Sequence, residues 1–370
     1  MWGIIATWCM ARDGVMDAGG RLAQLGSAAD AVETAVRAVE DCPFFKSVGY
    51  GGLPNEEMEV ELDAAFMDGD TLEFGAVGAL KNFANPVSVA RSLAGGEANN
   101  LLVGQGAEKY ADKMGFERKN MLTERAKGFY AKRLAQECAR VPGAARSLGE
   151  PEAEEESARG AVPCAGIDSE GTNPCGHDTV GAVCLDARGS MTAATSTSGL
   201  FMKLPGRVGD SPVPGCGYYV DSKIGGCAST GLGEDVMKGC VGYEIVRLMG
   251  EGLHPQIACE RAVHEFSEKL RERRGMVGDI SFVAMDAQGR WGAATNIEGF
   301  SFVVQTESDP ARVYLAHPQA DGTCLHEQAP VEWVEEYFSS RMAPLDWRAA
   351  AQRTVIPQCS AAGISRVPAA

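Results

Sequence analysis

Two segments of the chain repeat the same pattern of an apolar run, a tight turn and a second apolar run. The first comprises residues 179–185, the turn Asp186-Ala187-Arg188-Gly189 and residues 190–195; the second comprises residues 282–285, the turn Asp286-Ala287-Gln288-Gly289 and residues 291–295. Short apolar runs bounded by turn residues are typical of β-hairpins. The two hairpins therefore predict adjacent antiparallel strands in a buried sheet.

Helical periodicity surrounds these hairpins. Helices are predicted after Ser27, from Pro86 to about Leu93, at 106–113, at 124–138, at about 233–249 and 256–273, and at the start of the tail beyond about 331; further strands are predicted at 3–8, 59–67, 72–76 and 101–104. Clustered strands with helix pairs between them favour one structural domain of the α+β class, in which helices cover sheets.

Residues from about 140 to 176 break this pattern. Glutamates cluster around Pro151 among scattered Ser and Gly residues, and such a composition buries too little apolar surface to order itself. We predict an acidic linker that is functional or disordered, because it is too long for an ordinary loop.

The linker leads to a peptide bond whose cleavage would create a reactive N-terminal residue. Asp178-Thr179 follows it directly, and Thr179 opens the first hairpin. If that bond were cut, Thr179 would become an N-terminal residue that carries both a nucleophilic hydroxyl and its own base, the α-amine. The alternative is an ordinary strand that starts after a loop, and the residues downstream decide between the two.

Charge and composition exclude several classes of function. The chain has 370 residues and a net charge of -16 at pH 7, without a basic stripe. No nucleic acid is therefore expected as a partner, since binding it requires clustered Lys and Arg. No membrane span is expected either, because the apolar runs are too short.

The N-terminus indicates the compartment, and the spacing of the cysteines indicates whether a metal site is expected. As written, the chain lacks a secretory signal, so a cytoplasmic product is expected, whereas a truncated N-terminus would fit a lysosomal protein. The 12 cysteines include no C-x-x-C pair, so no metal site is predicted. Their disulfide pairing stays open, with Cys164 and Cys175 as a candidate pair in an oxidising compartment.

Arg207 and Asp210 lie three residues apart in a glycine-framed loop. A guanidinium group binds a carboxylate through two parallel N–H···O hydrogen bonds, and a carboxylate accepts hydrogen bonds from an ammonium group. Together the two residues suit an α-amino acid. The alternative is a surface salt bridge of little energetic weight.

Thr230-Gly231 precedes a predicted helix. A hydroxyl and a backbone N–H at such a place would stabilise an oxyanion; the alternative is a helix cap formed by Thr, with Gly in the turn. Other catalytic schemes are not indicated, because the sequence has neither an H-E-x-x-H zinc motif nor a G-x-S-x-G elbow.

Ordered motifs on both sides of the linker carry a family resemblance. After the linker these are Gly176-His177-Asp178-Thr179-Val180-Gly181, Thr195-Ser196-Thr197-Ser198-Gly199, Gly206-Arg207-Val208-Gly209-Asp210-Ser211-Pro212 and Thr230-Gly231-Leu232-Gly233-Glu234. Before it they include Thr7-Trp8 and Ser47-Val48-Gly49-Tyr50-Gly51-Gly52. Over roughly residues 4–305 the chain resembles the glycosylasparaginase (aspartylglucosaminidase) branch of the N-terminal-nucleophile asparaginases.

Two acidic residues distinguish branches of that family. Plant-type isoaspartyl peptidases usually carry Gly before the nucleophile, and taspase-like threonine aspartases typically lack an acidic residue at the position of Asp210. Asp178 and Asp210 therefore favour glycosylasparaginase. The alternatives are an L-asparaginase or isoaspartyl peptidase of the same fold, and an unprocessed, non-catalytic homologue.

The resemblance implies the four-layer αββα sandwich of N-terminal-nucleophile hydrolases. It also implies self-cleavage at Asp178-Thr179, beside His177, into an α chain (1–178) and a β chain (179–370), of which about 331–370 exceeds the usual family end. The mature enzyme would be an N-terminal threonine amidohydrolase that cleaves N4-(β-N-acetylglucosaminyl)-L-asparagine in glycoprotein degradation. It would be a homodimer of αβ units and would need no cofactor.

The same resemblance assigns roles to individual residues. Thr179 is the nucleophile, Thr197 orients its hydroxyl, and Thr230 with the N–H of Gly231 holds the oxyanion. Arg207 binds the α-carboxylate and Asp210 the α-ammonium, while Trp8, Ser47 and Gly233 contribute to the substrate pocket. Met10 stands where some relatives have Phe, which leaves the contact with the sugar open.

Overall fold

A computed structural model of the chain describes residues 1–96, 98–140 and 178–344. The predicted linker from residue 141 on, His177 and the end of the C-terminal extension lie outside these ranges. Up to residue 140 the elements are β1 (Gly3–Thr7), η1 (Cys9–Ala11), α1 (Arg12–Ala23), α2 (Ala28–Glu40), β2 (Leu62–Asp68), β3 (Phe74–Leu80), α3 (Pro86–Leu93), β4 (Leu101–Val103), α4 (Gly104–Lys113) and α5 (Glu124–Arg140). From residue 178 on they are β5 (Val180–Leu185), β6 (Met191–Thr197), β7 (Tyr218–Asp221), β8 (Gly225–Gly231), α6 (Gly233–Gly239), α7 (Val241–Gly250), α8 (Pro255–Arg274), β9 (Ile280–Asp286), β10 (Trp291–Thr295), β11 (Phe300–Thr306), β12 (Arg312–Pro318), β13 (Cys324–Gln328) and α9 (Val331–Met342).

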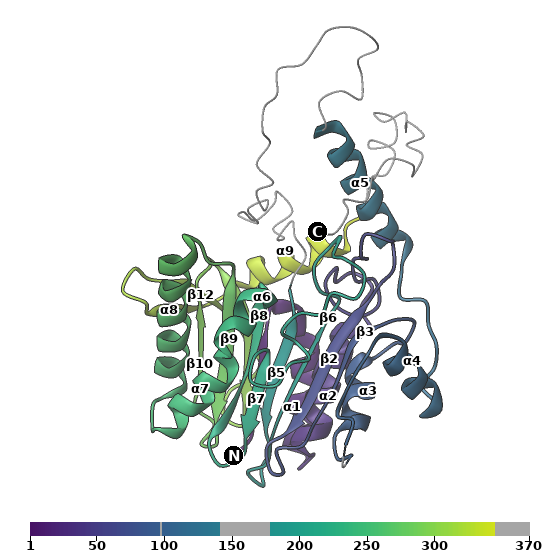
Figure 1. Cartoon of the computed structure of the whole chain (residues 1–370). Coiled ribbons are helices and arrows are strands. Elements are labelled where there is room, and N and C mark those ends of the chain that lie inside the picture. Colours follow the sequence, from purple (N-terminus) through teal and green to yellow (C-terminus); the bar gives the residue numbers. More distant parts are fainter. Residues whose placement is uncertain (97, 141–177, 345–370) are drawn as a thin grey trace, which may run out of the picture.

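The described strands form two sheets that pack face to face (Figure 1). One has nine strands in the order β13-β12-β11-β1-β5-β6-β2-β3-β4, and the other has four in the order β10-β9-β8-β7. Helices α1, α2 and α3 pack on the larger sheet, and α7 and α8 pack on the smaller one. This order of layers confirms the predicted αββα sandwich of the α+β class.

Three apolar layers hold the sandwich together. In β1, Ile4 belongs to the layer under α1 and α2, and its neighbour Ile5 belongs to the layer between the sheets. In β9, Val283 also lies between the sheets, whereas Phe282 packs towards α7 and α8. Full burial of such a side chain is worth roughly 1.5–3 kcal/mol. Central strands therefore carry apolar residues on both faces, which explains the continuous apolar runs of the sequence.

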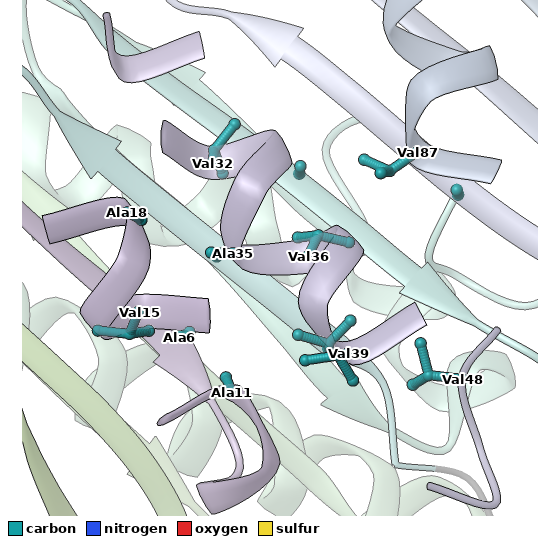
Figure 2. Packing of buried hydrophobic residues seen from close by; sticks show 14 of the residues in the cluster. Ala6, Ala11, Val15, Ala18, Val32, Ala35, Val36, Val39, Val48 and Val87 are labelled. Atoms are coloured by element: carbon teal, nitrogen blue, oxygen red, sulfur yellow. The ribbon is translucent and has the colours of Figure 1, made fainter. Parts of the chain in front are cut away.

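Helices α1 and α2 approach each other closely because their facing residues are small. A Cβ atom on Gly14 would lie 2.4 Å from the carbonyl oxygen of Ala35, so no larger residue fits at that position. Figure 2 shows Val15 and Ala18 beside Val32 and Ala35 in this buried cluster. The packed helix pair supports the strands that lead to the site described below.

Each predicted hairpin is present, but the two lie in different sheets. β5 pairs with β6 in the larger sheet, and β9 pairs with β10 in the smaller one. Their turns share the same chemistry: Oδ1 of Asp186 accepts the N–H groups of Arg188 and Ser190, and Oδ1 of Asp286 accepts those of residues 288 and 290. The expectation that the hairpins are adjacent in one sheet was wrong, because a turn fixes only local pairing.

Other elements match or depart from the sequence prediction for local reasons. Ser27 caps α2 and Pro86 begins α3, as predicted. The helix predicted over 233–249 is interrupted at Cys240, whose left-handed backbone (φ 45°) separates α6 from α7. Neither α1, which contains three glycines, nor β8, which is built of small residues, was predicted.

The tail begins with a helix, as predicted, and α9 is part of the core. It packs on η1, and its Tyr337 is buried in the same apolar cluster as Phe45. Arg125 of α5 donates to the carbonyl oxygens of Arg341 and Ala343 at 2.7 Å each. Figure 1 shows α9 running across the end of the sandwich from which α5 projects.

Candidate active site

Thr179 directly precedes β5 and is buried, with 3% of its surface exposed. Its backbone N–H donates to Oγ1 of Thr230 at 2.9 Å, and its own Oγ1 lies 3.3 Å from Oγ of Ser211. The nitrogen and the hydroxyl of Thr179 therefore both lie inside a buried polar cluster.

Thr230, near the end of β8, accepts two hydrogen bonds on one oxygen. Besides the N–H of Thr179, the indole N–H of Trp8 donates to its Oγ1 at 2.8 Å. A hydroxyl has two acceptor lone pairs and one O–H donor. Both acceptor positions are occupied, so the O–H is the only hydrogen-bonding capacity that Thr230 has left. The residue is thereby fixed as a donor, which is what an oxyanion site requires.

Gly231 follows with a backbone conformation that needs glycine. Its φ is 133°, and a Cβ atom there would lie 2.1 Å from the carbonyl oxygen of Asp279. Gly231 is the last residue of β8, and Leu232 is the N-cap of α6, without a side-chain cap. The alternative that Thr230 caps a helix is therefore wrong, and its hydroxyl remains available to the site.

Thr7, at the end of β1, fixes the backbone on the other side of Thr179. Its hydroxyl donates to the carbonyl oxygen of Thr179 at 2.6 Å and accepts the N–H of Gly181 at 2.9 Å. This bridge holds the start of β5 against β1. Thr7 belongs to a motif that marks the family, but its sequence position gave no sign of this role.

Ser211 is a second residue that sequence reasoning did not assign to the site. It is buried, and its hydroxyl is the side-chain neighbour of the Thr179 hydroxyl. Its carbonyl oxygen accepts the hydroxyl of Thr195 in β6 at 2.6 Å, which fixes the loop after Asp210 to the larger sheet. The sequence feature that could have identified Ser211 is its position directly after Asp210 in the motif of residues 206–212.

Asp210 is fully enclosed beside this cluster. Burial raises the pKa of its carboxyl group, and a hydrogen bond from the Ser229 hydroxyl opposes that rise. Gly233 packs directly on the carboxylate, because a Cβ atom at that glycine would lie 2.7 Å from Oδ1 of Asp210. Asp210 is thus a buried acceptor without a salt bridge among the described residues, and it is suited to pair with a cation from outside.

Arg207 pairs with Glu234 rather than with Asp210. Its Nε and Nη2 atoms donate to the two carboxylate oxygens of Glu234 at 2.9 and 2.7 Å. Burial alone would raise the pKa of Glu234, but the hydrogen bonds and charge of Arg207 hold it below its ordinary value. The surface salt bridge considered from the sequence does not form between Arg207 and Asp210, and one edge of the guanidinium is already engaged.

Thr197 and Ser47 lie next to each other. The Thr197 hydroxyl donates to the carbonyl oxygen of Ser47 at 3.2 Å and accepts the N–H of Gly199 at 3.0 Å. The pairing of Val180 with Ser196 in the β5–β6 ladder puts Thr197 opposite Thr179 at the next position. Here the hydroxyl orients the loop around Ser47, and a direct bond to Thr179 is not among its described contacts.

Within residues 1–96, 98–140 and 178–344, His, Cys, Asp and Glu form no group of three or more that is suited to hold a metal ion. No helix in the same ranges is long and apolar enough to cross a membrane.

The four-layer sandwich and the threonine at the start of a central strand define an N-terminal-nucleophile hydrolase. The sequence model of the family described as asparaginase matches residues 12–315, so the chain belongs to the asparaginase family.

The names of three similar proteins describe two activities. The chain is 34% identical to an N(4)-(beta-N-acetylglucosaminyl)-L-asparaginase of Elizabethkingia miricola, over 82% of this chain and 81% of the relative. It is 33% identical to the protein of that name from Mus musculus, over 75% of this chain and 81% of the relative. It is also 36% identical to an isoaspartyl peptidase/L-asparaginase of Mus musculus, over 73% and 76% respectively. Family membership therefore makes the chain an amidohydrolase.

Proposed function

We propose that this protein cleaves the side-chain amide of N4-(β-N-acetylglucosaminyl)-L-asparagine, after self-cleavage at Asp178-Thr179. The observation that carries the proposal is the hydrogen bond from the backbone nitrogen of Thr179 to Oγ1 of Thr230. It brings together the nitrogen that becomes the α-amine, the hydroxyl that attacks, and the donor that would hold the oxyanion.

The first reaction is internal. Oγ1 of Thr179 attacks the carbonyl carbon of Asp178, the peptide nitrogen leaves with a proton, and water hydrolyses the resulting ester. A peptide nitrogen is not basic, whereas a free α-amine has a pKa of about 7.7–8.0. Cleavage into residues 1–178 and 179–370 therefore creates the general base next to the hydroxyl that it activates.

The second reaction consumes the substrate. The α-amine takes the proton of Oγ1 as the oxygen attacks the side-chain amide carbon, and the hydroxyl of Thr230 and the N–H of Gly231 stabilise the oxyanion. One such donor contributes about 2.7–4 kcal/mol in other enzymes. Collapse expels the glycosylamine, which takes the proton back, and leaves a β-aspartyl ester on Thr179. Water then releases aspartate.

Substrate recognition follows from the charges beside the nucleophile. Glu234 holds Arg207 through Nε and Nη2, which leaves the edge with Nη1 for the substrate α-carboxylate. Asp210, which is buried and has no salt bridge to any residue that the structure describes, would take the α-ammonium. We assign Thr197 and Ser47 to the support of the nucleophile and Trp8 to the pocket wall and to Thr230.

Assembly and the competing activity are part of the proposal. We expect a homodimer of αβ units, which light scattering of the purified protein measures. An L-asparaginase or isoaspartyl peptidase activity of the same site is the second candidate, favoured by the relative of that name at 36% identity.

Substrate comparison tests the proposal. Matured protein is assayed with the glycosylasparagine, with L-asparagine and with a β-aspartyl dipeptide, and kcat/KM is measured for each. We expect the glycosylasparagine to have the highest kcat/KM. If it is the poorest of the three, the substrate assignment is wrong although the amidohydrolase chemistry stands.

A further inference from the structure

Two cysteines outside the proposed catalytic machinery lie beside the same backbone carbonyl group. Cys216 follows the loop that carries Asp210, and Cys240 separates α6 from α7. Cys240 is close enough to Cys216 to raise the pKa of its thiol. Both sulfur atoms also approach the carbonyl oxygen of Met237, at 4.0 Å and 3.9 Å. Thiols from two separate segments thus meet at one acceptor.

The two thiols differ in access to solvent. Cys240 is the exposed member, and it is the one exposed cysteine among those whose side chains the structure describes. Cys216 is buried, and burial, together with the neighbouring Cys240, raises the pKa of its thiol to about 12. A solute therefore meets Cys240 first, while Cys216 is held behind it as a second thiol.

The backbone segments that carry the two cysteines pack against each other. The N–H of Tyr243 donates to the carbonyl oxygen of Gly215 at 2.9 Å, and a Cβ atom on Gly242 would lie 2.7 Å from the carbonyl oxygen of Cys216. Residues 215–216, before β7, and residues 242–243, at the start of α7, are thus in tight contact. A disulfide requires two such segments to lie close together, and both thiols lie within 4.0 Å of the same carbonyl oxygen.

We infer that Cys216 and Cys240 are a modification site that takes a low-molecular-weight disulfide, such as oxidised glutathione, and converts it into an internal disulfide bond. Cys240 attacks one glutathione sulfur and releases the first glutathione, which leaves a mixed disulfide on Cys240. Cys216 then attacks the sulfur of Cys240 and releases the second glutathione. Two protein thiols are oxidised, one glutathione disulfide is reduced to two thiols, and the two protons leave with the glutathione molecules.

The bond would join two segments that both support Asp210. The N–H of Val213 donates to the carbonyl oxygen of Asp210 at 2.9 Å, in the turn that leads to Cys216. At the other end, Gly233, which packs on the Asp210 carboxylate, begins the helix that ends before Cys240. A cross-link restricts the unfolded chain, so we expect the oxidised protein to unfold at a higher temperature. None of this depends on which amide the enzyme cleaves.

Peptide mapping tests the inference on the full-length protein. Samples are equilibrated with oxidised or with reduced glutathione, quenched with acid, alkylated with N-ethylmaleimide and digested without reduction. In the oxidised sample we expect a cross-linked pair of peptides that contain Cys216 and Cys240, lost after reduction. If both cysteines are instead recovered alkylated, or if Cys240 carries glutathione while Cys216 stays free, the inference is overturned.

Variants separate this bond from other cysteines. Cys216→Ser removes the resolving thiol, so Cys240 should accumulate as a mixed disulfide with glutathione. Cys240→Ser should leave Cys216 reduced. Cys42→Ser, which changes a partly exposed cysteine on the other side of the sandwich, serves as the matched control and should form the cross-link like the unaltered chain. The rise in Tm on oxidation should disappear in the first two variants only; an equal rise in all three would contradict the assignment.

Discussion

The backbone nitrogen of Thr179 and Oγ1 of Thr230 are 2.9 Å apart, although they are held by different sheets. Thr179 directly precedes β5 of the nine-stranded sheet, and Thr230 lies in β8 of the four-stranded sheet. The stacking of the two sheets therefore sets the distance between the proposed nucleophile and the proposed oxyanion donor. The proposed catalytic geometry therefore depends on the packing between the two sheets.

Thr230→Val keeps the volume of the side chain and removes its hydroxyl. We expect kcat to fall by about 10²–10³, the loss seen when one oxyanion donor is removed, with a smaller change in KM. Steady-state kinetics of the matured variant measure this. Thr34→Val, which alters a helix-surface hydroxyl bonded to the Asp30 carbonyl, is the control and should leave kcat unchanged. An unaltered kcat in Thr230→Val would exclude the oxyanion role.

Trp8→Phe keeps an aromatic ring and removes the N–H that donates to Thr230 at 2.8 Å. The vacated lone pair lets the Thr230 hydroxyl rotate, so the donor is less well oriented. We expect kcat to fall by about fivefold, in line with a hydrogen bond of roughly 1 kcal/mol. Trp291→Phe, in an aromatic cluster with Phe302 and Tyr314, controls for loss of an indole. Equal effects of the two substitutions would contradict the explanation.

Asp210 should shape the pH dependence of kcat/KM. Burial raises its pKa, and only the ionised form pairs with the substrate ammonium, so kcat/KM should fall as pH decreases through that raised pKa. The α-amine of Thr179 contributes a second ionisation to the same acid limb, because it must be neutral to act as a base. The acid limb should therefore approach a slope of about 2 on a logarithmic plot and about 1 in Asp210→Asn.

The control for Asp210→Asn is Asp309→Asn, which changes an exposed carboxylate in the loop between β11 and β12. Its acid limb should match that of the unaltered enzyme. If Asp210→Asn also keeps the steeper slope, then Asp210 does not bind the ammonium in its ionised form.

Glu40 should make the fold less stable as pH rises. It is fully buried at the end of α2, and burial raises the pKa of its carboxyl group to about 8 from 4.5. Oε1 accepts the N–H of Val87 at the start of α3 at 3.0 Å. The folded chain holds this proton more tightly than the unfolded chain, so the contribution is complete below pH 4.5 and is lost as pH rises to about 8.

Glu40→Gln removes this titration. The free energy of unfolding of the unaltered chain should fall, relative to the variant, by several kcal/mol between the two pKa values, at about 1.4 kcal/mol per unit. Denaturant unfolding in a Thr179→Ala background, where one covalent chain unfolds, measures the difference at several pH values. Glu57→Gln alters an exposed carboxylate and should follow the unaltered chain. Parallel pH curves for Glu40→Gln and the unaltered chain would refute a buried neutral carboxyl.

The layered fold was predictable because local patterns carry it. Hairpin turns with Asp and Gly, the Ser27 cap and Pro86 at a helix start are all decided within a few residues, and the structure has each of them. Stacking of the two hairpins into separate sheets depends on contacts between Val183 and Val283 across the interior, which no local pattern encodes.

The site was predictable only where single residues carry its chemistry. Thr179, Thr230 and Asp210 stand in motifs with an evident chemical logic. The roles of Thr7 and Ser211 depend on hydrogen bonds between residues that are far apart in the sequence. Likewise, Glu234 had to be seen beside Arg207, because the sequence alone suggested Asp210 as the nearer partner.

Intact mass spectrometry of the purified protein tests the central claim that Thr179 first cuts its own chain. The unaltered protein should yield two chains, 1–178 and 179–370, in place of a single species of 39.1 kDa. Thr179→Ala should remain uncut and inactive, and Thr179→Ser, which keeps a hydroxyl, should mature in part. A single 39.1 kDa chain from active, unaltered protein, or cleavage of Thr179→Ala at the same bond, would contradict the account.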